Sequence, residues 1–192
     1  EYSFHFAKRL IKSQDVLMAV EFYSSLGPGC DNPGTSWSAL RSLCIQFPLL
    51  LRGSLALFDA DVGASELAKI KDSDLYLTLP DGDSLAIERR IIVHILGLGN
   101  DDPFFMKFDQ ERDSFLAEFK AAGVKSLKIA DVMDESKTPI ARCKAWADTD
   151  KAKFKRCITD YCDHSSLKDE FRLKFVERIN EINQQVGLPS IH

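Results

Sequence analysis

The sequence predicts a mainly α-helical, compact domain of about seven to nine helices with at most a minor two- or three-stranded β element. Three observations lead to this prediction. Apolar residues recur at helical spacing along most of the 192 residues, helix-capping residues precede many of these stripes, and only one short run alternates like a strand. Hydrophobic residues make up 45% and charged residues 28% of the chain, which is typical of a folded protein rather than a disordered one.

The first third is expected to hold two helices within residues 1–26, the second of which begins near Ser13 or Asp15. Residues 27–34 are rich in Pro and Gly and are predicted to form a loop. A further helix begins at Thr35 or Ser36.

Pro48 ends that third helix, since proline lacks the N–H that a helix interior needs. The apolar run 49–58 is interpreted as either a buried strand or a short helix, because periodicity does not separate the two in short runs. A turn and a short helix are expected between Asp59 and Ile70.

The best strand signal is the alternating run Leu75–Leu79, which ends at Pro80, Asp81 and Gly82. We expect it to pair with residues 55–58 as a small hairpin. Because an isolated hairpin is marginally stable in water, it needs a helix packed on it.

The middle of the chain is expected to contain two longer helices. Asp83 or Ser84 begins the first, and Gly97 with Gly99 ends it. Asp102 and Pro103 begin the second, which is expected to continue to about Ala122 before Gly123 ends it. Residues 124–132 favour a short strand or turn.

The last third has the clearest signals, with three helices predicted between Thr138 and Gly187. Thr138 and Pro139 begin the first, and Asp148 or Thr149 begins the second. Ser166 and Asp169 form a capping box for the third, which Gly187 and Pro189 close. Six apolar residues share one face of this final helix: Leu167, Phe171, Phe175, Ile179, Ile182 and Val186.

Charge is distributed unevenly along the chain. The net charge is −4, but residues 1–119 carry 11 Lys and Arg against 18 Asp and Glu, whereas residues 120–192 carry 14 against 11. We predict a single α-rich domain over residues 1–192, with an acidic sub-lobe 1–122 and a basic helical sub-lobe 123–192. Opposite charges of this kind permit head-to-tail self-association.

The five cysteines are odd in number and lack the spacing of a disulfide framework, which favours a reducing, intracellular location in the cytoplasm or nucleus. No apolar run reaches the ~18–20 residues of a membrane span, so no membrane partner is predicted. The chain starts at Glu1 and is interpreted as a fragment of a larger cellular or viral protein.

A basic segment lies within residues 137–156. Clustered Lys and Arg side chains hold phosphate backbones, and aromatic rings stack on unpaired bases. We expect Lys153 and Arg156 to project to solvent, opposite the Phe154 and Ile158 face. The candidate residues for RNA or an acidic partner are Arg142, Lys144, Trp146, Lys151, Lys153, Lys155 and Arg156.

No metal centre or cofactor is predicted. The residues Cys143, Cys157, Cys162 and His164 suit zinc chemically, but their spacing does not match a zinc site, and burial is the better interpretation of the cysteines. The sequence from Asp59 fails the calcium-loop pattern, which requires Gly at its sixth position and a bidentate Glu at its twelfth. The remaining metal alternative uses the turn carboxylates Asp59, Asp61, Asp81 and Asp83.

Three functional hypotheses follow. The leading one is a non-enzymatic protein-interaction or assembly domain, because the chain has a folded composition and carries no P-loop, dinucleotide fingerprint or nucleophile elbow. Its partner is another protein or a second copy. The alternatives are RNA or single-stranded nucleic-acid binding through residues 137–156, and a metal-dependent enzyme that uses the four aspartates.

Overall fold

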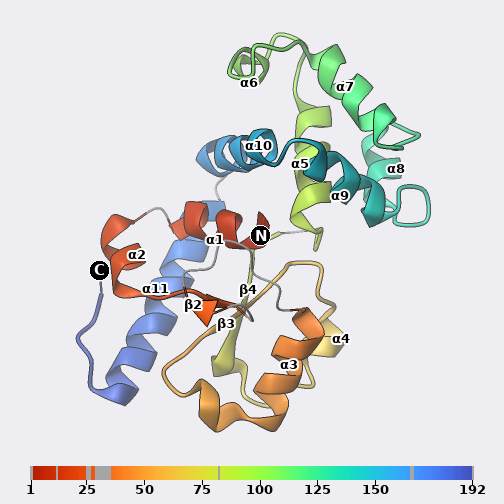
Figure 1. Cartoon of the computed structure of the whole chain (residues 1–192). Helices are drawn as coiled ribbons and strands as arrows, with labels where there is room; N and C mark the ends of the chain where they lie inside the picture. The colour runs from red at the N-terminus through yellow and green to blue at the C-terminus, as the bar shows by residue number, and fades with distance from the viewer. Residues whose placement is uncertain are drawn as a thin grey trace. The chain divides into compact units, whose positions relative to one another are not determined.

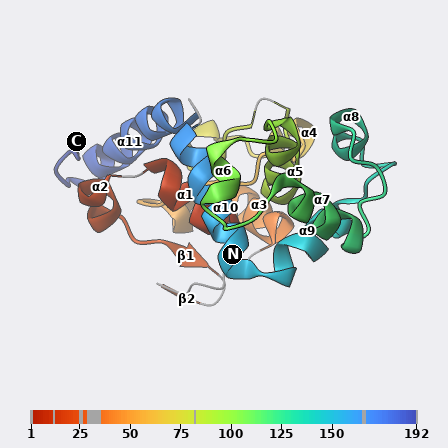
Figure 2. The ribbon, with the colours of Figure 1, turned by 90° about the horizontal axis from the view of Figure 1, so that it is seen from above.

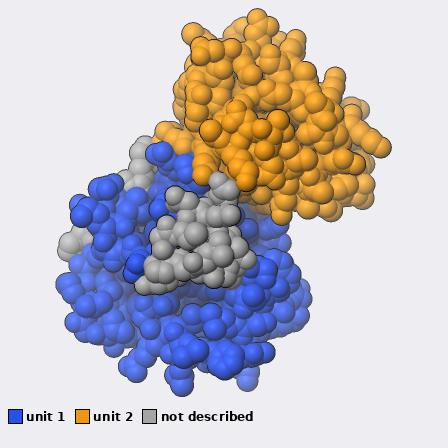
Figure 3. All heavy atoms as spheres, in the orientation of Figure 1, with its two compact units in different colours: residues 1, 3–84, 165–192 blue, residues 2, 85–164 orange. Residues whose placement is uncertain are grey.

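The chain divides into two compact units, which Figure 3 colours separately. The computed structural model describes residues 2–11, 13–24, 27–28, 36–81, 83–164 and 167–191. The first unit comprises residues 1, 3–84 and 165–192, and the second comprises Tyr2 and residues 85–164. The predicted sub-lobe boundary near residue 122 falls inside the second unit. That unit carries 14 Lys and Arg against 14 Asp and Glu, so the basic surplus of residues 120–192 does not belong to one compact unit.

The mainly helical fold with a minor β element is confirmed. Eleven α-helices occur in the described residues, and seven of them have ten or more residues (Figure 1). The other four are short, with four to six residues each. The count exceeds the seven to nine expected because the helix predicted from Pro103 to Ala122 is two helices and α8 was not predicted.

The first unit contains both helices and short strands. Its elements are α1 (Tyr2–Ile11, with Tyr2 counted in the second unit), α2 (Gln14–Ala19), β1 (Tyr23–Ser24), β2 (Gly27–Pro28), α3 (Trp37–Gln46), the 3-10 helix η1 (Pro48–Leu51), β3 (Ala56–Phe58), α4 (Ala64–Leu67), the 3-10 helix η2 (Ser73–Leu75), β4 (Tyr76–Thr78) and α11 (Leu167–Val186). Most of the predicted loop 27–34 and the predicted cap Ser166 lie outside the described residues.

Strands β3 and β4 pair in parallel, with Ala56 opposite Tyr76 and Phe58 opposite Thr78. The predicted hairpin is therefore wrong in its direction, although both strands were expected. The chain from 59 to 75 crosses back through α4 and η2, because parallel strands require a crossover rather than a tight turn. Phe58 is 1% exposed and packs with Cys44 and other buried residues of the unit.

The second unit is built only of helices in the described residues. Its elements are α5 (Ile87–Gly97), α6 (Pro103–Met106), α7 (Arg112–Ala121), α8 (Ile129–Met133), α9 (Ile140–Thr149) and α10 (Lys151–His164). The central helix is α5, which contacts α8, α9 and α10 (Figures 1 and 2). Its residues Ile91, Ile92 and Ile95 are fully buried, as expected for a helix surrounded by others.

Three helices begin at a residue whose side chain accepts a hydrogen bond from a backbone N–H of the first helical turn. Ser36 accepts a hydrogen bond from the N–H of Ala39 at 3.2 Å, and Asp102 accepts one from Phe104 at 2.9 Å. Asp150, rather than Asp148 or Thr149, caps α10 by accepting from Lys153 at 2.9 Å. Such bonds satisfy N–H groups that have no partner inside the helix.

Three predicted elements of the middle region are wrong. The cap of α5 is Ala86 rather than Asp83 or Ser84. The expected helix from Pro103 to Ala122 is two helices, because the chain turns at Asp109, which has a φ of +52°. The expected strand or turn within 124–132 contains the start of α8.

Candidate functional site

An exposed apolar surface lies on the first unit and was not predicted. It combines residues after α3 with the end of α11. We define the apolar surface by six side chains, with their exposed fractions: Ile45 43%, Phe47 52%, Leu49 85%, Leu50 73%, Val186 41% and Leu188 59%. Large apolar side chains exposed on two segments that contact each other make a candidate interaction site.

The local sequence explains why Leu49 and Leu50 face outward. Phe47 leaves the helical conformation, with φ −132° and ψ 51°, and Pro48 then begins the 3-10 helix η1. Three residues per turn place Pro48 and Leu51 on one side, and Leu51 packs against the core of the unit. Leu49 and Leu50 therefore point away from that core.

The end of α11 joins this surface through Gly53. A Cβ atom added at Gly53 would lie 3.8 Å from Cγ1 of Val186. The loop after α3 and the end of α11 consequently lie side by side in the first unit (Figure 1).

The sequence left residues 49–58 as a buried strand or a short helix. The structure contains a short 3-10 helix at its start and β3 at its end, but Leu49 and Leu50 are exposed rather than buried. A signal for this was present, because Pro48 and the Arg52–Gly53 turn bracket the three leucines and separate them from the later apolar residues.

A second candidate site lies where the two parallel strands end. Asp59 follows β3 directly, and Asp81 comes three residues after the last residue of β4. Parallel strands place their carboxyl ends at one edge, where ligands commonly bind. Asp59 and Asp81 are half-buried, whereas Asp61 and Asp83 are exposed. Asp81 also accepts a hydrogen bond from the N–H of Asp83 at 2.9 Å.

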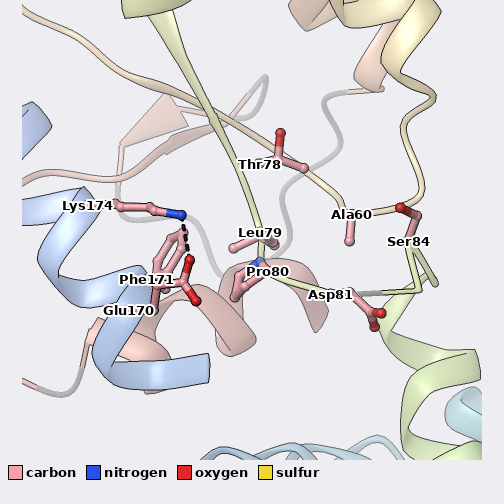
Figure 4. Close-up of a pocket in the computed structure, with 9 residues that line it drawn as sticks. All are labelled: Ala60, Thr78, Leu79, Pro80, Asp81, Ser84, Glu170, Phe171 and Lys174. Atoms are coloured by element: carbon pink, nitrogen blue, oxygen red, sulfur yellow. Dashed lines mark hydrogen bonds and ion pairs between the residues drawn. The ribbon is translucent and has the colours of Figure 1, made fainter. Parts of the chain in front are cut away.

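A pocket of about 350 Å³ opens beside this edge. Figure 4 shows Ala60, Asp81 and Ser84 on one side of it and α11 on the other. From α11, Lys174 donates to Glu170 at 2.6 Å, and this hydrogen bond lowers the pKa of the Glu170 carboxyl. In the described part of the chain, no group of three His, Cys, Asp or Glu side chains is placed to hold a metal ion.

The basic segment of the second unit is not arranged as expected. Trp146 is only 4% exposed, and its indole N–H donates to Glu118 at 3.3 Å, so the ring is not free to stack on a base. Lys153 does not project to solvent. Its side chain is 14% exposed, its Nζ lies 2.6 Å from both carboxylate oxygens of Glu118, and it sits 3.9 Å from the ring centre of Phe115.

Arg142 and Arg156 are exposed, as predicted for Arg156, but both side chains also contact the protein. The guanidinium of Arg156 stacks 4.6 Å from the ring centre of Phe108 and donates to the carbonyl of Lys107. A Cβ at Gly123 would lie 3.0 Å from Cδ of Arg142, so glycine at this positive-φ helix end lets the Arg142 side chain lie over the backbone. Lys144 and Lys151 are exposed and Lys155 is half-buried. Nucleic-acid binding through this segment stays a prediction, without a stacking aromatic from Trp146 to support it.

The four described cysteines are buried, and His94 is half-buried. Burial raises the pKa of Cys143 to about 11 and that of Cys157 to about 12, so both remain thiols at neutral pH. Burial also lowers the pKa of His94, while the nearby Asp160 opposes this shift. The His94 ring packs edge-on against Phe104 and Tyr161, which is the environment of a neutral core histidine.

Comparisons with protein-family models, with curated proteins and with solved structures gave no match. Among the described residues, no helix has the length and apolar character needed to cross a membrane. The proposals for function therefore rest on the geometry of the candidate sites.

Proposed function

We propose that this chain is a protein-interaction domain that binds a partner protein through the apolar surface. The observation that carries the proposal is the exposure of Leu49 and Leu50, at 85% and 73% of their full areas. Leaving such side chains in water forfeits about 1.5–3 kcal/mol each relative to full burial. A partner that covers them recovers part of this free energy, after the cost of association.

The exposed apolar groups are concentrated rather than scattered. Single exposed apolar side chains are normal on any protein surface, and Leu173 on α11, at 72% exposure, is an example. The apolar surface instead brings side chains of two distant segments together. This difference distinguishes a candidate interface from ordinary surface composition and provides a matched control.

The test is site-specific photo-crosslinking with a photoreactive amino acid at position 49 or, as the control, at position 173. Both positions replace an exposed leucine of the first unit, so nonspecific labelling should affect them equally. We expect defined protein adducts from position 49 that are absent from position 173 and that disappear when Leu50→Asp is added. Mass spectrometry of the adducts identifies the partner. Equal or no labelling at the two positions would contradict the proposal.

A second candidate function is metal-dependent catalysis at the carboxyl edge of β3 and β4. The observation that favours it is the parallel pairing, which brings the segments carrying Asp59 and Asp81 to one edge. Mg²⁺ is commonly held by one or two carboxylates together with waters and substrate phosphates, so two aspartates are sufficient protein ligands. The two exposed aspartates, Asp61 and Asp83, would add negative charge around such an ion.

The metal hypothesis is tested by thermal unfolding with and without Mg²⁺ or Mn²⁺. A bound ion should raise the melting temperature by about 2–4 °C, and Asp59→Asn should remove this increase. The control is Asp15→Asn, which removes the same charge from an exposed position in α2 of the same unit. A parent protein that is insensitive to both ions would exclude this function.

We also propose an intracellular location. Cys44, Cys143, Cys157 and Cys162 are free and buried, which agrees with a compartment where thiols stay reduced.

A further inference from the structure

We propose that the occupant of the apolar surface is a second copy of this chain, joined in a two-fold symmetric dimer. This inference rests on the proposed protein-interaction function and names the partner. In a two-fold contact the same patch is used by both copies, so the patch must be complementary to itself. Its charge, its polar rim and its area each meet this requirement.

The two segments that form the surface are almost uncharged, in a chain of which 28% is charged. Arg52 is the single charged residue from 42 to 58, and residues 182–191 contain none. The whole chain has a net charge of −4, so two copies repel each other where their charged surfaces approach. The apolar surface is therefore a place where two copies can meet without pairing like charges or removing several charges from water.

Neutral hydrogen-bonding groups flank the apolar residues in the sequence, together with the single exposed charge of Arg52. Gln46 and Gln185 are exposed and adjoin apolar residues of the surface, and the exposed Gln184 precedes Gln185. An amide side chain offers both donors and an acceptor, so a glutamine can bond to another glutamine of an identical surface. A rim of lysines or of glutamates alone would not have this property.

The area is also compatible with a dimer contact. The six side chains are 41–85% exposed, so together they present several hundred Å² of apolar area. A standard interface buries about 800 Å² on each partner, to which neighbouring polar groups also contribute. A patch of one or two leucines would fall far short.

The experiment measures mass against protein concentration by sedimentation velocity and light scattering. The unmodified chain should change from monomer to dimer as its concentration rises. Leu50→Asp and, separately, Leu188→Asp should each weaken the dimer by about 100-fold or more, because each places a carboxylate in an apolar contact. Leu173→Asp, an equivalent change outside the surface, should dimerise like the parent.

Salt dependence separates this dimer from association driven by charge. An uncharged apolar contact should persist or strengthen in high salt, whereas head-to-tail pairing of acidic and basic regions should weaken. Circular dichroism and melting temperature of each variant establish that it is folded. A parent that remains monomeric at all concentrations, or a dimer that is unchanged by both substitutions, would overturn the inference.

Failure of the dimer and failure of the interaction function give different results. If the chain is a monomer but position 49 crosslinks to a different protein, the dimer is wrong and the protein-interaction function stands. If the chain is a monomer and position 49 yields no adduct beyond that of position 173, both are wrong.

Discussion

Replacing Phe115 with alanine should lower the free energy of unfolding of the second unit by about 3–5 kcal/mol, which is typical of a deleted core aromatic. Phe115 is 0% exposed and its ring lies 5.4–6.4 Å, centre to centre, from four other phenylalanine rings. The substitution leaves a cavity among α6 and α7 that rigid neighbouring rings cannot close.

Urea unfolding followed by tryptophan fluorescence measures this effect. The chain has two tryptophans, Trp37 in the first unit and Trp146 in the second. A Trp37→Phe background therefore makes the fluorescence report on the second unit. Met106→Ala is the control, because Met106 lies in the same unit, is 77% exposed, and its loss should cost less than about 1 kcal/mol. Equal effects of the two substitutions would contradict the burial that the structure assigns to Phe115.

Replacing Glu118 with alanine should destabilise the second unit by about 1.5–3 kcal/mol, the range for hydrogen bonds to charged groups. The Glu118 carboxylate accepts from Lys153 at 2.6 Å and from the indole of Trp146 at 3.3 Å. Without it, the indole N–H loses this acceptor, and the largely buried ammonium loses its counter-charge and keeps the neutral Gln110 Oε1 at 2.6 Å. The energetic penalty exceeds the small value expected for an exposed surface ion pair.

A double-mutant cycle isolates this interaction from other effects of the substitution. Lys153→Met keeps the apolar stem over Phe115 and removes the ammonium, so Glu118→Ala should cost less in that background than in the parent. Glu111→Ala is the matched control, since Glu111 is exposed and makes no capping hydrogen bond at the start of α7. Additive effects of Glu118→Ala and Lys153→Met would show that the two side chains are not coupled.

The Lys153 pairing also explains why the predicted solvent exposure of Lys153 is wrong. Helical spacing places Lys153 next to Phe154 rather than on its face, which predicts a solvent-exposed cation. The partner that turns it inward, Glu118, lies 35 residues earlier in α7. A long-range ion pair of this kind leaves no periodic signal, because periodicity describes only neighbours within one helix.

The parallel direction of β3 and β4 was similarly beyond the sequence pattern. Alternation in Leu75–Leu79 identified a strand, and the apolar run ending at Phe58 was compatible with one. Alternation does not specify which neighbour a strand takes or in which direction. The crossover through α4 and η2 decides that direction, and with it the meeting of the segments that carry Asp59 and Asp81 at one edge.

By itself, the sequence determined the helical class, the position of β4 and the helix ends at which a local cap or glycine acts. Ser36, Asp102 and Gly123 belong to this group, because their effects depend on atoms a few residues away. Only the tertiary structure decided which side chains are exposed. Leu50 and Trp146 are both large apolar residues, yet one is 73% exposed and the other 4%. Burial depends on the elements that pack around a residue, and those elements come from distant parts of the chain.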